Sequence, residues 1–102
     1  MKLELRSQEK LLATETASHV MNMLFIPQPN PGKLTVTTQR IKFHGSRVKA
    51  EFEYDLNEID SFSVGMASAI TINCKDGRKH KITGMYNKKL IAAIEELGIR
   101  KE

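Results

Sequence analysis

The feature that most constrains the fold is an alternation of apolar and polar residues with a period of two, which runs through most of the chain. Successive side chains of a β-strand point to opposite faces, so this alternation is typical of antiparallel strands with one buried face. Residues 47–56 show it most clearly, with apolar side chains in one phase and charged ones in the other. We expect this segment to pair with residues 40–44 across Gly45 and Ser46, which places basic residues of one strand beside acidic residues of the other.

A second hairpin is expected from residues 70–74 and 78–83, and the length of its loop decides which residues face each other. A two-residue turn would place lysines on the apolar face, because a slip of one residue inverts every side chain. A three-residue loop sets Ile72 opposite His80 and keeps the apolar residues together. We therefore predict a three-residue loop, with Gly77 in the left-handed conformation.

Only the end of the chain has a helical period, and we predict a helix over about residues 87–97. Asn87 is expected to cap its first turn, and Gly98 to end its last. Its buried stripe is expected to comprise Leu90, Ile91, Ile94 and Leu97. A stripe of this kind is usually a packing face, so we expect the helix to close the core formed by the strands.

The length of 102 residues fits one domain, covering residues 1–102, and we expect its N-terminal residues 1–8 to be flexible. The single cysteine, Cys74, excludes an internal disulfide and fits a reducing, cytoplasmic compartment. The longest apolar stretch near the N-terminus, Met23 to Ile26, is far too short for a membrane span or a signal peptide. Any contact with a membrane is therefore expected to be peripheral, at the inner face.

The net charge of +4 arises late in the chain, because the basic residues of 31–50 are balanced by the acids of 51–60. The remaining excess comprises Lys75, Lys79, Lys81, Lys88 and Lys89. The first three occupy the polar phase of the second hairpin, so they form an outward row. Such a row attracts phosphates or anionic lipids. However, a row of lysines more often simply faces solvent and binds nothing.

A second candidate surface is the apolar segment 20–26, which holds more apolar side chains than strict alternation can bury on one side. Its candidate interface residues are Met21, Met23, Phe25 and Ile26. Methionine-rich apolar surface suits an adaptable contact with a second copy, another protein or a membrane. Core packing is the alternative explanation for the segment. We expect a homo-oligomer, with this segment or an open sheet edge contributing to the contact.

Catalytic patterns are absent from the sequence. His19, His44 and His80 fall on different predicted strands, with His80 facing the core and His44 at a strand end. Cys74 has no cysteine partner and is expected to behave as a small apolar side chain. We therefore expect no enzyme activity, no catalytic residue, no metal, no cofactor and no small-molecule substrate.

The run GKLTVTTQRIKFHG resembles the most specific motif of the GRAM domain, a member of the pleckstrin-homology-like superfold. The matching positions are Gly32, Leu34, Val36, Thr37, Arg40, Ile41 and Phe43. The segment EKLLATETASHV resembles the family's first strand, with Ala17 and His19 at its alanine and histidine positions. The resemblance implies a mainly β fold, a barrel of two nearly orthogonal antiparallel sheets with about seven strands, closed by one C-terminal α-helix.

The same resemblance implies a non-catalytic module that binds proteins or the surface of a membrane. Phosphoinositide-binding relatives carry basic residues around the first loop, whereas the segment IPQPNPG here is uncharged and is followed only by Lys33. We therefore expect little preference among lipid head groups.

A small basic β-barrel that binds nucleic acid is the alternative class. Such a protein needs exposed aromatic rings on its charged face, and the aromatic residues of this chain mostly fall on inward phases. An aromatic ring exposed beside Lys75, Lys79 and Lys81 would favour nucleic acid, and its absence there would favour the GRAM interpretation.

Overall fold

The computed structural model describes residues 4–23, 26–47 and 50–102, with the side chains of Asn22 and Met23 left undescribed. The strands are β1 (Leu11–Met23), β2 (Ile26–Thr37), β3 (Arg40–Gly45), β4 (Phe52–Asp55), β5 (Ile59–Val64), β6 (Ile70–Cys74) and β7 (Lys79–Thr83). Short 3-10 turns at Leu56–Glu58 and Met66–Ser68 flank β5, and one α-helix, α1 (Asn87–Glu96), follows β7. No helix within these residues is both long and apolar enough to cross a bilayer.

The seven strands form one open antiparallel sheet in the order β4-β3-β2-β1-β7-β6-β5. The mainly β class with a C-terminal helix is therefore confirmed, but the hydrogen bonds do not show the expected pair of separate sheets or a closed barrel. The reason lies in β1, which pairs with β2 along nearly its whole length and with β7 at Ser18–Val20. A strand shared in this way joins both halves into one sheet.

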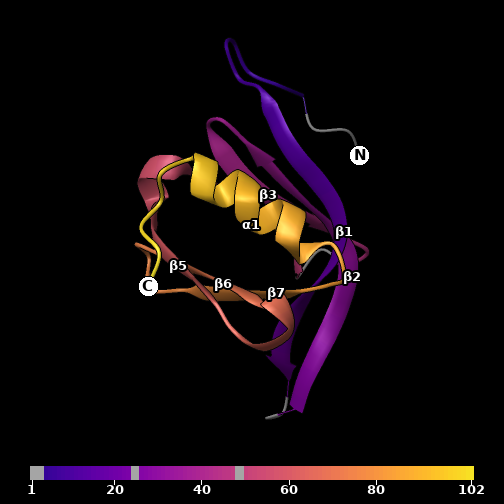
Figure 1. The fold of residues 1–102 in the computed structure, drawn as a ribbon. Coiled ribbons are helices and arrows are strands. Elements are labelled where there is room, and N and C mark those ends of the chain that lie inside the picture. Colours follow the sequence, from indigo (N-terminus) through magenta and orange to yellow (C-terminus); the bar gives the residue numbers. More distant parts are fainter. Residues whose placement is uncertain (1–3, 24–25, 48–49) are drawn as a thin grey trace.

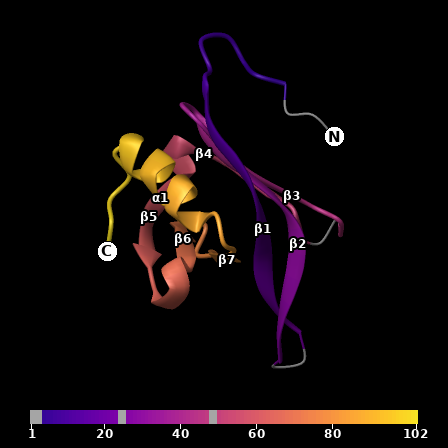
Figure 2. The same cartoon turned by 45° about the vertical axis from the view of Figure 1, so that its right-hand side comes forward.

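The sheet nevertheless changes direction between its halves. In Figure 1, β5, β6 and β7 run across the direction of β1 and β2, and Figure 2 shows α1 lying in the angle between the two halves. Buried side chains of α1, such as Leu90 and Ile94, share one core with Phe43 on β3 and Ile82 on β7. The helix therefore holds the halves together by apolar packing.

The second hairpin has the predicted register. Ile72 lies opposite His80, and the chain turns through a loop in which the Gly77 N–H donates to the Cys74 carbonyl at 3.0 Å. Gly77 has φ = 89°, a left-handed conformation that glycine adopts without strain. The three-residue loop is therefore confirmed.

The first hairpin is confirmed only in its pairing. Lys42 on β3 lies opposite Glu53 on β4, and their charges are 3.8 Å apart. However, Phe43 pairs with Phe52, so the connection is longer than a turn at Gly45 and Ser46. Residues 48–49 of that connection lie outside the described residues.

The helix ends where expected at Gly98, which has φ = 75°, but its start differs from the prediction. Tyr86, not Asn87, holds the capping position. Asn87 is buried and donates from its side-chain amide to the carbonyls of Ser68 and Ile82, at 2.9 and 3.0 Å. The polar side chain thus ties the helix to the sheet. Along the stripe, Leu90 and Ile94 are buried with Ala93, while Ile91 and Leu97 are only half-buried.

Candidate functional site

The predicted lysine row is present on the outer face of β6 and β7. Lys79 and Lys81 are exposed, and they lie opposite Asn73 and Thr71, respectively. Lys75 is exposed at the start of the loop. Among the described residues none of these three lysines forms an ion pair, so the row presents uncompensated positive charge.

Lys88 and Lys89 are exposed too, but they belong to another surface. They lie in the first turn of α1, and Leu90 of that helix is buried in the core that also contains Ile82 of β7. Lys79 and Lys81 alternate with the buried residues of β7, so they point to the opposite face. The structure therefore separates the five candidate lysines into two groups.

Of the apolar candidates, Met21 and Ile26 lie near the end of the β1–β2 hairpin where β1 ends and β2 begins. Ile26 is 61% exposed, whereas Met21 is half-buried against the core. The side chain of Met23 and all of Phe25 lie outside the described residues. The hairpin extends beyond the rest of the sheet (Figure 2), because pairing with β7 ends at Val20 while pairing with β2 continues to Met23.

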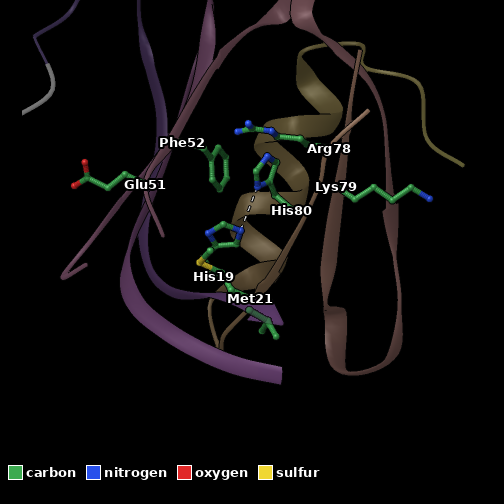
Figure 3. A pocket seen from close by; sticks show the side chains of 8 residues that line it. His19, Met21, Glu51, Phe52, Arg78, Lys79 and His80 are labelled. Atoms are coloured by element: carbon green, nitrogen blue, oxygen red, sulfur yellow. Dashed lines mark hydrogen bonds between the residues drawn. The ribbon is translucent and has the colours of Figure 1, made fainter. Parts of the chain in front are cut away.

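A pocket that the sequence did not indicate opens where β1 and β7 separate. Its volume is about 410 Å³, and it is bordered by β1, the start of β4 and the start of β7. Figure 3 shows the rings of His19, His80 and Phe52 gathered at its centre, while the Lys79 side chain points away. Lys79 belongs to both the pocket and the outward row, so the two features are adjacent.

The two histidines join a continuous series of polar contacts across the core. His19 Nδ1 lies 2.7 Å from the Ala50 carbonyl oxygen, and its Nε2 lies 3.2 Å from His80 Nδ1. His80 Nε2 lies 2.9 Å from the Tyr54 hydroxyl, which donates to Asp76 Oδ2 at 3.0 Å. We call these five residues the histidine relay. It connects the segment before β4 with the loop between β6 and β7.

Burial keeps the two histidines and the tyrosine of this relay uncharged. It lowers the pKa of His19, and burial together with the neighbouring His19 lowers the pKa of His80 to about 4. Burial and the hydrogen bond to Asp76 raise the pKa of Tyr54 to about 12. Both histidines and the tyrosine are therefore neutral at pH 7.

Cys74 is buried, and that burial raises the pKa of its thiol to about 11. A thiol at such a pKa is a poor nucleophile and a poor metal ligand. His44 is partly exposed, 2.7 Å from Glu51, so it takes no part in the relay. In the part of the chain that the structure describes, no three metal-ligating side chains come together.

Sequence reasoning placed His80 correctly among core residues but missed its contact with His19. Both lie in the inward phase of their strands, which is the signal available in the sequence. The contact itself depends on β1 pairing with β7, where His19 lies opposite Ile82. Strands so far apart in the chain have no loop to fix their register.

Comparison with known proteins supports the fold and leaves the function open. A crystal structure of the C-terminal domain of an unknown protein from Leishmania infantum is similar to this chain, with a TM-score of 0.71 and 20% sequence identity. The match covers 89% of this chain and 85% of that domain. No family model and no curated protein match the chain.

Proposed function

We propose that this chain is a non-catalytic binding module of the GRAM type, within the pleckstrin-homology-like superfold. The sheet order, with β4 and β5 at the two edges and a terminal helix between the halves, supports that architecture of two nearly orthogonal halves. Motif positions also support it, because Leu34 and Phe43 are fully buried and Arg40 forms buried ion pairs. The proposal includes no enzymatic activity and no cofactor.

The partner that we propose is an anionic surface, contacted by Lys75, Lys79 and Lys81. The observation that carries this proposal is the exposure of all three lysines without an ion pair among the described residues. Like charges on one face repel one another, and a bound polyanion offsets this electrostatic repulsion. Basic side chains near an anionic membrane each contribute about 1 kcal/mol. The inner face of a cell membrane, in the cytoplasm, is the anionic surface that this mechanism suits best.

Nucleic acid fits this face less well. The described aromatic residues are mostly buried, and Tyr86, which is 43% exposed, lies at the start of α1 rather than on β6 or β7. Bases would therefore find no stacking platform among the described residues of these two strands.

Self-association is a second candidate function, and the exposure of Ile26 at the end of the projecting hairpin favours it. This contact involves a surface other than the lysine row. It can therefore coexist with binding to a membrane, and it is tested separately.

Vesicle co-sedimentation tests the lysine face. We expect the wild type to bind phosphatidylcholine vesicles that contain phosphatidylserine, and to be released as salt rises above about 0.1 M. The double variant K79E/K81E should lose at least about thirtyfold in affinity, because two favourable charges are removed and two repulsive ones added.

The matched control is K88E/K89E, which makes the same change of charge on α1. We expect it to bind more tightly than K79E/K81E, and both variants to unfold at nearly the wild-type temperature. Equal losses in the two variants would mean that net charge alone drives the association. Wild-type binding that survives K79E/K81E and high salt would contradict the proposal.

A further inference from the structure

The histidine relay is one proton short of satisfying all of its contacts. Both of its ends, the Asp76 carboxylate and the Ala50 carbonyl, can only accept hydrogen bonds. Four contacts separate these ends, and each needs one proton. Neutral Tyr54, His80 and His19 supply only three. One contact in the neutral relay therefore brings two acceptors together.

The two groups that donate to the ends of the relay show which contact lacks a proton. The Ala50 carbonyl fixes the proton of His19 on Nδ1, and Tyr54 donates to Asp76. His80 then donates from Nε2 to the tyrosine oxygen, which leaves His80 Nδ1 and His19 Nε2 as two acceptors 3.2 Å apart. A proton placed between them completes every contact of the relay.

Tyr54 can also turn its proton toward His80, and then its contact with the Asp76 carboxylate is unmade. Asp76 is an exposed residue of the β6–β7 loop, so water replaces that contact there. Both arrangements lack one proton. The second also removes one side-chain contact between the core and the loop that carries Lys75.

Burial opposes a proton on the histidines of the free protein more than the surrounding charges do, because Asp76 favours the proton and Arg78 opposes it less strongly. From β7 and its loop, Arg78 and Lys79 border the same pocket as the two rings. From the segment before β4, Glu51 borders the pocket but already lies 2.7 Å from His44. From the loop, Asp76 is the acid at the end of the relay and accepts from Tyr54, and Cys74 nearby carries a neutral thiol. From β2 and β3, the neighbours are the uncharged Asn30 and Phe43.

We propose that the lysine face binds its anionic partner together with one proton, which the His19–His80 pair takes up. The inference rests on the proposed function, since it concerns the regulation of that same face. A partner docked on Lys79 and Lys81 brings negative charge close to β7, which favours a proton on His80 in the same strand. Because linkage is reciprocal, a proton on the pair strengthens the attraction for the partner to the same extent.

Uptake of the proton would also stabilise the loop between β6 and β7. With all four contacts made, Tyr54 donates to Asp76 and holds the turn that positions Lys75 and Lys79. Acidification would therefore add a positive charge beneath the row and order the residues that carry it.

The dependence of vesicle binding on pH tests this proposal. As pH falls from about 6.5 toward 5 the wild-type affinity should rise, by at most tenfold per pH unit for one proton taken up. H80Q retains an amide that can donate and accept but does not titrate, so its affinity should be nearly independent of pH while remaining sensitive to salt. H19Q serves as the second variant, and urea unfolding checks that both fold.

The control is H44Q, which removes the exposed histidine that pairs with Glu51 and should leave the slope unchanged. Calorimetry in two buffers of different ionisation enthalpy should detect proton uptake on binding by the wild type and not by H80Q. Binding whose slope persists in both H80Q and H19Q would overturn this inference and leave the proposed function standing. Absence of wild-type binding at every pH would overturn both.

Discussion

Glu9 and Arg40 form a buried ion pair, with Arg40 Nε 2.9 Å from Glu9 Oε2, although 31 positions separate them in the chain. Arg40 also contacts Glu53 on β4 at 2.6 Å and donates to the Glu4 carbonyl at 2.7 Å. Thr37 donates to the same Glu9 carboxylate. One arginine thus ties the segment before β1 to β3 and β4.

Replacing Arg40 with alanine should destabilise the fold by about 3 to 5 kcal/mol, because it leaves the Glu9 carboxylate buried without its partner. Urea unfolding measures this loss. The control is Arg6→Ala, since Arg6 forms an exposed ion pair with Asp55 at 2.9 Å and should contribute no more than about 1 kcal/mol. Similar losses in the two variants would show that the buried Glu9–Arg40 pair contributes no more to stability than the exposed pair does.

Acid should weaken the fold first through His80. Its pKa falls from 6.5 to about 4 in the folded chain, so the unfolded chain takes up the proton first as pH decreases. The free energy of unfolding should therefore be highest above about pH 6.5 and should decrease toward pH 4. Urea unfolding at a series of pH values measures this. H80Q should show a flatter profile in that range, and an unchanged profile would refute the assignment.

Glu9 should produce a second loss at lower pH. Burial alone would raise its pKa, but hydrogen bonds from Arg40, the Arg6 backbone and Thr37 outweigh burial and lower the pKa from 4.5 to about 2. Stability from this group is thus present above about pH 4.5 and lost as pH falls toward 2. The variant E9Q should be less stable than the wild type at neutral pH, and the difference should shrink below pH 4. A constant difference would contradict this prediction.

The parts of the fold that the sequence predicted are those fixed by neighbouring residues. The register of β6 and β7 followed from alternation and a short loop, because only one loop length keeps Ile72 and Ile82 on the buried face. The position of α1 followed from its period and from Gly98. Local geometry determines these features, so no knowledge of the rest of the chain was needed.

The features that sequence reasoning missed depend on distant segments. The burial of Arg40 depends on Glu9, and the contact between His19 and His80 depends on β1 reaching β7. Asn87 was predicted as a cap because asparagine is favoured there, but a carbonyl at Ser68 offered its amide a buried acceptor. Tertiary contacts decided all three positions.

Truncation of Ile94 tests whether α1 belongs to the core. Ile94 is fully buried in the cluster that contains Leu90 and Ile82, so Ile94→Ala should cost about 2 to 5 kcal/mol in urea unfolding. Ile91→Ala, at a half-buried position of the same helix, should cost clearly less. A loss below about 1 kcal/mol for Ile94→Ala would place the helix outside the cooperative unit.

Gly32 should tolerate no side chain, because a Cβ atom there would lie 2.3 Å from the His44 carbonyl oxygen and 2.7 Å from the Gly45 Cα atom. These are backbone atoms of β3, so relief requires the paired strands to move apart. Gly32→Ala should destabilise the protein by about 1 to 3 kcal/mol. Gly65→Ala is the control, since its nearest neighbour would be 4.0 Å away. Thermal unfolding compares the two, and equal stability would show that β2 and β3 are less closely packed.

The end of the β1–β2 hairpin should mediate self-association through apolar side chains and not through added strands. Pro27, Pro29 and Pro31 lie in the part of β2 that has no partner beyond β1 among the described strands, and they provide no N–H for a further strand. Ile26, 61% exposed, is therefore the side chain expected to make the contact.

Ile26→Glu should shift the protein toward the monomer, because a carboxylate in an apolar contact loses its hydration without gaining a partner. Light scattering over a range of concentrations measures the mass. Leu11→Glu places the same charge at an exposed residue at the opposite end of the β1–β2 pair, and this variant should have the same mass as the wild type. A wild type that remains monomeric at high micromolar concentration, or a Leu11 variant that dissociates as readily, would exclude this hairpin end as the interface.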